Sequence, residues 1–219
     1  MAALENQTVE NQTAGHVVLQ NIAWSTYEAI VAENRNPGTR FTYDRGTLEI
    51  MSPSKEQQRC KKLIGRMIET MTEELGIPIR SAGSTTWTSE ARQQGLEPDE
   101  CYYVANESRV RGRDEIDLAV DPPPDLAIEV EISSRLIDKM PIYARLGVPE
   151  VWRYDGRTLQ VEQLQRDGTY ARQDHSSAFP FLPLAEMTRF LDRRNATDET
   201  SWIRSFRQWV GTPRESQDG

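Results

Sequence analysis

The sequence predicts a mixed α/β or α+β domain, and three features of the chain lead to that prediction. Helix-like and strand-like patterns follow one another in the order helix, hairpin, long helix, several strands, helix and strands. Residues 54–75 carry apolar side chains at helical spacing over several turns. Short runs rich in β-branched and aromatic residues are separated by turn signals. The 219 residues suit one domain of the larger sort, or a domain with a tail.

The composition excludes several classes of protein. Acidic residues number 34 against 26 basic ones, and the net charge of -8 argues against a protein that coats nucleic acid by overall charge. No stretch approaches the ~18 apolar residues of a membrane span, and residues 1–15 lack the features of a signal peptide. We therefore expect a cytoplasmic protein with no membrane partner. The two cysteines, Cys60 and Cys101, make no disulfide framework, and we expect no disulfide-linked partner.

The N-terminal part of the chain predicts a tail followed by a helix. Residues 1–15 are polar and lack periodicity, which indicates a flexible N-terminal tail. Ser25 and Glu28 match a capping box, in which the two side chains satisfy amides at the start of a helix. We therefore expect a helix over about 25–34.

A hairpin and a long helix come next. Two β-prone runs flank Gly46, which can adopt a positive φ, and this predicts a hairpin over 40–50. The long helix over 54–75 has a row of apolar residues at helical spacing: Leu63, Met67, Met71 and Leu75. Gly76 stands where a left-handed cap would end this helix. The first helix, the hairpin and the long helix together predict an N-terminal helix-hairpin-helix extension.

Short strands dominate the remainder of the chain. The β-prone runs after the long helix are IPIRSAG, TTWTS, DECYYVA, IDLAV and DLAIEVEI, with Gly95 expected as a turn. A short helix is expected over about 140–146, and the runs EVWRY, TLQVEQL and TYARQ then predict a meander. From Leu184 onward the pattern is helical. We expect a single domain over 16–192, and a C-terminal helix and tail over 193–219.

One predicted strand carries more carboxylates than strands usually do. In DLAIEVEI, the alternation of side chains places four apolar residues on one face: Leu126, Ile128, Val130 and Ile132. The other face carries Asp125, Ala127, Glu129 and Glu131. Neighbours on this face lie roughly 7 Å apart, so solvent, protein cations or a divalent metal must offset their repulsion. Two interpretations stay open: a solvated edge strand whose charges oppose aggregation, or a strand that presents oxygen ligands to Mg²⁺.

Three further residues favour the metal-site interpretation. Asp99 precedes the β-prone run CYYV at a separation from Glu129 that suits two acids on neighbouring strands, although a turn aspartate is the alternative. Lys139 precedes Pro141, which fits only the first turn of a helix, so Lys139 is expected at the helix start. Tyr143 follows four residues later on the same helical face. Taken alone, Lys139 also suits an ordinary surface lysine, and Tyr143 a packing residue.

Together, Pro98-Asp99, the acids at 129 and 131 and a lysine shortly afterwards resemble the PD-(D/E)XK nuclease superfamily, and more specifically its Uma-two family of restriction endonucleases. The matching stretches run from about residue 20 to 190 and include YDRG, MSP, GLEPDECYYV, DPPPDLAIEVEISS and KMPIYARLGVPEVWRY. The resemblance implies a restriction-endonuclease-like fold, with a mixed central sheet flanked by helices. It also implies an Mg-dependent endonuclease, a hydrolase that cleaves DNA phosphodiester bonds.

The resemblance gives a role to each matching acid. Asp99 would be the first Mg²⁺ ligand and Glu129 the second, with the carbonyl of Val130 as a candidate third ligand. Mn²⁺ would substitute for Mg²⁺. Glu56, near the start of the long helix, is a candidate additional acid, and the alternative is that it favours the positive end of the helix.

The chain departs from the superfamily motif at one position. The lysine that usually follows two residues after the second acid is replaced by Glu131. Lys139 would take over that role from the following helix, so that the implied catalytic set is Asp99, Glu129, Glu131, Lys139 and Tyr143. The departure keeps a second hypothesis open, that of a catalytically inactive nuclease fold kept as a binding or assembly module.

DNA as a substrate requires a basic surface, whatever the net charge. The candidate DNA-contacting residues are Arg109, Arg111, Arg113, Lys61 and Lys62. The alternative for the three arginines is a solvated charged loop. RNA or branched DNA is an alternative substrate, and a homodimer is a candidate assembly because many nucleases dimerise to cut both strands.

Overall fold

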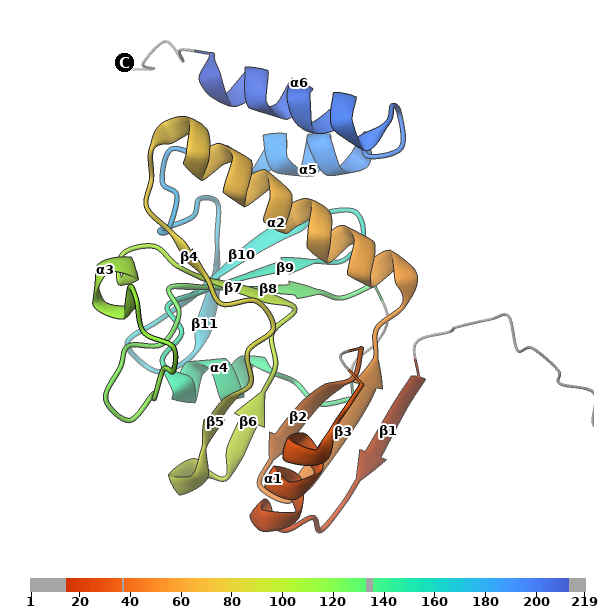
Figure 1. Ribbon diagram of the computed structural model, residues 1–219, viewed down its shortest axis with the longest axis vertical. Coiled ribbons are helices and arrows are strands. Elements are labelled where there is room, and N and C mark those ends of the chain that lie inside the picture. Colours follow the sequence, from red (N-terminus) through yellow and green to blue (C-terminus); the bar gives the residue numbers. More distant parts are fainter. Residues whose placement is uncertain (1–14, 37, 133–135, 213–219) are drawn as a thin grey trace, which may run out of the picture.

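Two β-sheets, with helices packed on them, make up the fold in this computed structural model (Figure 1). The structure describes residues 15–36, 38–132 and 136–212. The first sheet comprises β1 (Gly15–Leu19), β2 (Arg40–Asp44), β3 (Thr47–Ser52), β5 (Trp87–Ser89) and β6 (Gln94–Leu96). Its strand order is β1-β3-β2-β6-β5, and every neighbouring pair is antiparallel.

The second sheet is mixed. It comprises β4 (Arg80–Ser81), β7 (Glu100–Tyr103), β8 (Leu126–Val130), β9 (Glu150–Tyr154), β10 (Leu159–Leu164) and β11 (Tyr170–Gln173). In the order β11-β10-β9-β8-β7-β4, β8 and β9 run parallel and the other neighbours antiparallel. The short helix α4 (Met140–Leu146) joins the parallel pair, because parallel strands need a crossover connection. A mixed sheet flanked by helices confirms the predicted fold class.

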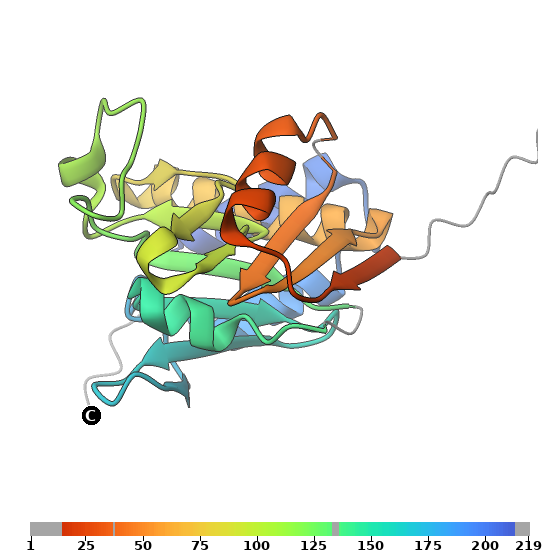
Figure 2. The ribbon, with the colours of Figure 1, turned by 90° about the horizontal axis from the view of Figure 1, so that it is seen from below.

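Helices cover both faces of this six-stranded sheet. α2 (Lys55–Leu75) crosses one face, and α5 (Leu184–Asp192) and α6 (Glu199–Gly211) pack against α2 on the same side (Figure 1). α4 lies on the opposite face, which is seen from below in Figure 2. α1 (Trp24–Glu33) packs on the five-stranded sheet, and α3 (Glu107–Val110) stands in the connection between β7 and β8. Among the described residues, no helix combines the length and the apolar character that crossing a membrane requires.

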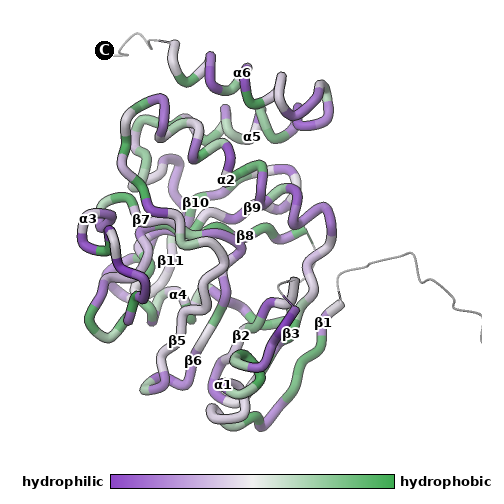
Figure 3. Tube along the Cα trace, in the orientation of Figure 1, coloured by the Kyte–Doolittle hydropathy of each residue, from purple (hydrophilic) through white to green (hydrophobic). Residues whose placement is uncertain are grey.

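The long helix α2 matches its prediction closely. Its hydrophobic and hydrophilic residues alternate along the helix (Figure 3), and the side chains of Leu63, Met67 and Met71 are buried against β8 and the helices α5 and α6. Leu75, expected on the same row, is instead 43% exposed, because it lies in the last turn before the helix ends. Gly76 caps the helix in the left-handed conformation, with φ of 64°.

The helix, the hairpin and the long helix of the predicted N-terminal extension are all present in that order as α1, β2-β3 and α2. Their grouping as a separate extension is not confirmed. The hairpin pairs with β6, and α2 belongs to the core of the six-stranded sheet. The predicted capping box at Ser25 is wrong, since α1 begins at Trp24 and Ala23 is its N-cap without a side-chain hydrogen bond. The rings of Trp24 and Tyr27, with centroids 5.1 Å apart and tilted to one another, pack together in the first turn of α1, and both side chains are buried.

Two local predictions after α2 are also wrong. Gly95 is not a turn but lies within β6, where the ring of Tyr27 packs against it; a Cβ at this position would stand 2.9 Å from Tyr27 Cζ. The run IDLAV is not a strand but a series of turns around Asp117. The Asp117 side chain accepts a hydrogen bond from Ala119 N at 2.9 Å, and its carbonyl accepts one from Asp121 N at 2.7 Å. An aspartate that binds nearby amides competes with strand pairing.

The predicted tails fall largely outside the described residues. Of the N-terminal tail over 1–15, only Gly15 is described, and it begins β1. The C-terminal helix expected within 193–219 is α6, whose residues Ile203, Phe206 and Val210 are buried in the same core as α2. The boundaries of the predicted domain, 16–192, stay a prediction.

Candidate active site

The strand with the unusual carboxylates, β8, is a central strand. It lies between β7 and β9 (Figure 1), and each of its five residues is buried. Leu126, Ile128 and Val130 face the core under α2, as the alternation predicts. Ala127 faces the second core, where α4 packs, and Glu129 is only 1% exposed. The interpretation of β8 as a solvated edge strand is therefore wrong.

Asp99 meets β8 from the neighbouring strand. Its backbone amide donates to Ile128 O at 3.1 Å, continuing the antiparallel ladder of β7 and β8. Its side-chain Oδ2 accepts a hydrogen bond from Val130 N at 2.7 Å. Because its main chain binds Ile128 and its side chain binds Val130, Asp99 is fixed against β8 on either side of residue 129, and it is only 4% exposed. Asp99 lies at the entrance of β7, as the sequence predicts, and Glu129 lies in the neighbouring strand β8.

Lys139 and Tyr143 reach Glu129 from α4. Lys139 is the N-cap residue of this helix, and a proline follows in the first turn, as the sequence predicts. Lys139 Nζ lies 3.0 Å from Glu129 Oε1 and 3.3 Å from Oε2, and it donates to Glu97 O at 2.7 Å. The Tyr143 hydroxyl, one turn later, donates to Glu129 Oε1. The carboxylate is thus buried together with an ammonium group and a hydroxyl donor, as a buried charge requires.

A Mg²⁺ ion beside Glu129 stays a prediction. The protein would hold it with the carboxylates of Asp99 and Glu129, which suits an ion that commonly binds one or two carboxylates, waters and substrate phosphate. Val130 O, the candidate third ligand, accepts a hydrogen bond from Gln57 Nε2 at 3.3 Å and keeps a second lone pair. In the part of the chain that the structure describes, no three His, Cys, Asp or Glu side chains gather as a metal site.

Two of the predicted acids face other partners. Glu131, just beyond the end of β8, accepts hydrogen bonds from Arg153 Nη2 at 2.7 Å and Nε at 3.0 Å. Glu56 pairs with Arg194 Nη2 at 2.9 Å, and this guanidinium lowers the pKa of the Glu56 carboxyl group. Both carboxylates are engaged at the protein surface, so neither joins the cluster around Glu129.

The three arginines predicted to contact DNA lie at the other end of β8. Asp125, which precedes β8, accepts hydrogen bonds from Val104 N at 2.7 Å and Asn106 N at 2.9 Å, and this fixes the start of the loop that carries them. The strand of five residues between Asp125 and Glu131 spans roughly 15 Å. Within the loop, Arg111 pairs with Glu107 and Arg113 with Asp121, while Arg109 Nη1 donates to Asn106 Oδ1. The structure therefore does not bring this loop to the acids.

Sequence reasoning missed several residues around Asp99. Glu97, in the segment that leads to Asp99, is buried; burial raises the pKa of its carboxyl group, and Thr86 Oγ1 donates to it at 2.8 Å. Arg40, from β2, lies 4.0 Å from the same carboxyl group. Gln57 has two roles. Its Oε1 accepts a hydrogen bond from Ser54 N at 2.9 Å at the start of α2, and its Nε2 donates to Val130 O. The capping pattern Ser54-x-x-Gln57 was the one available signal for Gln57.

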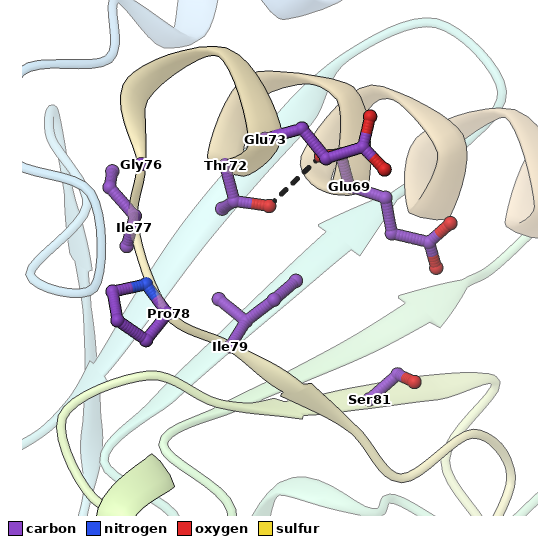
Figure 4. A pocket seen from close by; sticks show the side chains of 8 residues that line it. All are labelled: Glu69, Thr72, Glu73, Gly76, Ile77, Pro78, Ile79 and Ser81. Atoms are coloured by element: carbon purple, nitrogen blue, oxygen red, sulfur yellow. Dashed lines mark hydrogen bonds between the residues drawn. The ribbon is translucent and has the colours of Figure 1, made fainter.

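A surface pocket lies apart from these residues, at the C-terminal end of α2 (Figure 4). It is lined by Glu69, Thr72, Glu73, Gly76, Ile77, Pro78, Ile79 and Ser81. None of these is a predicted site residue, and the carboxylates of Glu69 and Glu73 oppose an anionic ligand. The predicted site residues therefore lie outside this pocket.

Comparisons with known proteins bear on the fold and on the family. The family model Uma2, described as "Putative restriction endonuclease", matches residues 24–191. Among solved structures, a "putative nuclease belonging to DUF820" from Anabaena variabilis ATCC 29413 superposes with a TM-score of 0.53. Its sequence is 15% identical, and the match covers 78% of this chain and 99% of that chain, which shows a shared fold. No curated protein is significantly similar in sequence.

Proposed function

Because the chain belongs to the Uma2 family of restriction-endonuclease-like proteins, we propose that it is an Mg²⁺-dependent endonuclease that hydrolyses DNA phosphodiester bonds. The family supports a nuclease; the DNA substrate, the metal and the site residues are the proposal. In it, Asp99 and Glu129 hold Mg²⁺, or Mn²⁺ in its place, and Lys139 acts beside them.

One observation carries this proposal. The ammonium group of Lys139, the N-cap of α4, lies 3.0 Å from the carboxylate of Glu129, on β8, and Asp99 immediately precedes the neighbouring strand β7. The superfamily motif has a lysine two residues after the acid, and here a glutamate that pairs with Arg153 occupies that position. A lysine supplied by α4 restores the same neighbourhood of two acids and one ammonium group.

Each residue has a separate task in the proposed reaction. When bound, Mg²⁺ supplies activation of the attacking water and neutralises charge on the phosphate. The ammonium group of Lys139 stabilises negative charge that develops on the phosphate oxygens in the transition state. Tyr143 donates to Glu129 Oε1, and Val130 N donates to Asp99 Oδ2, so the two carboxylates keep their orientation. Because Lys139 also donates to Glu97 O, its ammonium group is held in place from two sides.

Nicking of supercoiled plasmid in Mg²⁺ or Mn²⁺ tests the proposal. We expect Glu129→Gln, Asp99→Asn and Lys139→Ala each to lower the cleavage rate by roughly 10²–10³-fold, because each removes an electrostatic contribution to the transition state. The matched control is Asp174→Asn, which neutralises an exposed carboxylate just after β11 and should cleave like the wild type. Wild-type protein without cleavage in either metal, or Glu129→Gln cleaving at the wild-type rate, contradicts the proposal.

A second candidate function is a catalytically inactive nuclease fold that serves as a binding or assembly module. The observation that favours it is the engagement of both Glu129 oxygens by Lys139 and of one by Tyr143, together with Glu131 at the usual lysine position. Calorimetric titration with Mn²⁺ separates the two functions. The module predicts no heat of binding, whereas the nuclease predicts binding that Glu129→Gln abolishes. The remaining alternative is that the same site cleaves RNA or branched DNA. Cleavage assays with a panel of these substrates test it.

A further inference from the structure

We propose that Glu49 is a positioning residue, which holds the backbone just before α4 and so keeps the ammonium group of Lys139 against Glu129. The inference rests on the proposed function and adds to it a residue of the five-stranded sheet that acts through Lys139 and not on the DNA. It is carried by a buried carboxylate of β3 that binds the main chain three residues before Lys139.

Strand β3 carries Glu49 between two residues that face α1. Leu48 is buried in the core that α1 covers, and Ile50 packs against the same core. Because side chains alternate along a strand, Glu49 projects from the opposite face of the sheet. It is only 2% exposed there, and a buried carboxylate needs hydrogen-bond donors to offset its lost hydration.

Two donors from distant parts of the chain meet at one oxygen of Glu49. His16 Nδ1, on β1, lies 3.0 Å from Oε1, and because an ionised carboxylate only accepts, the imidazole is the donor. Leu136 N donates to the same oxygen at 3.1 Å. His16 lies two residues before Val18, the β1 partner of Glu49, so both side chains project from one face of adjacent strands. The imidazole thus orients the carboxylate, and the carboxylate holds the main chain at Leu136.

The bond at Leu136 lies close to Lys139 along the chain. Only Ile137 and Asp138 separate the two residues, so their α-carbons are at most about 11 Å apart. Ile137 is buried in the core where α4 packs, and Asp138 Oδ1 accepts a hydrogen bond from Met140 N at 3.0 Å. These contacts leave the main chain between Leu136 and Met140 little freedom, and the bond to Glu49 ties it to the five-stranded sheet.

The helix α4 is short, so its placement depends on contacts at its ends. It has seven residues, of which Ile142 and Tyr143 are buried, and a helix of two turns is marginal by itself. Its last turn makes a second contact with the β2-β3 hairpin, where Arg145 Nη1 lies 3.9 Å from Asp44 Oδ1. Both of these side chains are partly exposed, and such a pair contributes little. The buried bond at Leu136 is therefore the stronger tie between the hairpin and the chain that carries Lys139.

The NMR resonance of the Lys139 ammonium group, in protein with ¹⁵N-labelled lysine, tests the positioning without cleavage. This resonance is identified by its loss in Lys139→Ala. We expect Glu49→Leu, which removes the acceptor, to shift or broaden it, and to raise the exchange rate of the Leu136 amide by at least about tenfold. Glu49→Gln keeps an acceptor oxygen and should behave like the wild type in both measurements. Arg145→Gln, which breaks the partly exposed pair at the other end of α4, is the matched control and should leave both unchanged.

Plasmid nicking supplies a second readout. Glu49→Leu should lower kcat by about tenfold or more and leave KM nearly unchanged, because a misplacement of about 1 Å can cost about 10²-fold in rate. In the Lys139→Ala background the same substitution should cause no further loss, since Glu49 acts through that lysine. Glu49→Thr, which also suits a strand, is the second variant should Glu49→Leu fail to fold.

Two results would overturn the positioning role of Glu49. One is a Lys139 resonance that is unchanged in the folded Glu49→Leu or Glu49→Thr variant. The other is a loss of kcat that adds in full to that of Lys139→Ala. If the wild type does not cleave at all, the proposed function fails, and a shifted Lys139 resonance in Glu49→Leu still supports Glu49 as the residue that positions this lysine.

Discussion

Glu129 shows how a residue that is unfavourable in a strand is accommodated in a buried cluster of charged and polar groups. Its carboxylate sits in a buried strand, where an isolated charge would be strongly destabilising. One helix, α4, supplies both of the donors that the structure describes there, the ammonium group of Lys139 and the hydroxyl group of Tyr143. The stability of this region and the proposed chemistry therefore depend on the same contacts.

The Lys139–Glu129 pair predicts a measurable stability difference. Lys139→Met removes the ammonium group from a carboxylate that is 1% exposed, and we expect the free energy of unfolding in urea to fall by about 3–5 kcal/mol. The double variant Glu129→Gln/Lys139→Met removes both charges and should regain a large part of that loss. Arg153→Met, which breaks the partly exposed pair with Glu131, serves as the control and should cost less than about 1 kcal/mol. Equal losses for Lys139→Met and Arg153→Met would contradict the assignment of a buried pair.

At the scale of the elements, the strand β9 is tied to the chain that follows β11 by a second buried carboxylate. Glu150 is fully buried and accepts hydrogen bonds from Trp152 Nε1 at 2.6 Å and Ser177 N at 2.6 Å. It also accepts bonds from the hydroxyl groups of Ser176 and Ser177. The donors of Ser176 and Ser177 hold the segment before α5 against the sheet, a role that the sequence pattern of β9 does not indicate.

Glu150→Ala should therefore destabilise the protein strongly. It leaves several buried donors without their acceptor, and each such loss typically costs about 1–3 kcal/mol. We expect a total loss of more than about 3 kcal/mol in urea unfolding. Glu162→Ala, on the neighbouring strand β10 and partly exposed, is the control and should change stability by less than about 1 kcal/mol. A loss for Glu150→Ala as small as that of the control would contradict the anchoring role.

At the scale of the whole molecule, two separate cores each enclose one cysteine. Cys60 lies in the core beneath α2, and Cys101 lies in the core between the two sheets and α4. Both thiols are free, and burial raises the pKa of Cys60 to about 11 and that of Cys101 to about 12. Each thiol therefore reports on the integrity of a different core.

The two thiols predict a reactivity and a pH dependence. At pH 8 we expect neither to react with a thiol reagent such as Ellman's in the folded protein, and both to react after unfolding in urea. Because the folded pKa values lie above the unfolded value near 8.5, stability is fully present below about pH 8.5 and falls as the pH rises through the folded values. The comparison protein is Cys60→Ser/Cys101→Ser, which should lose less stability between pH 8 and 10. Rapid reaction of either thiol in the native protein would contradict the burial of that core.

The sequence allowed much of the fold and part of the candidate site to be predicted. The period of the apolar residues over 54–75 located α2, the turn residues located the β2-β3 hairpin, and a proline in the first turn located α4 with Lys139 at its start. Side-chain contacts explain why the predictions at Gly95 and over IDLAV are wrong. The ring of Tyr27 occupies the space beside Gly95, and the side chain of Asp117 takes amides that a strand would have used.

What the sequence alone determined is most of the helices and strands and the candidate residues Asp99, Glu129 and Lys139, because alternation along β8 and turn chemistry are local. The tertiary structure alone decided which charged residues meet. It placed Glu131 and Glu56 against Arg153 and Arg194, and it brought Arg40 and Lys61 to Ser84 from strands and helices far apart in the chain. The physical reason is that a side chain's partner depends on the register and packing of distant elements, which no local pattern encodes.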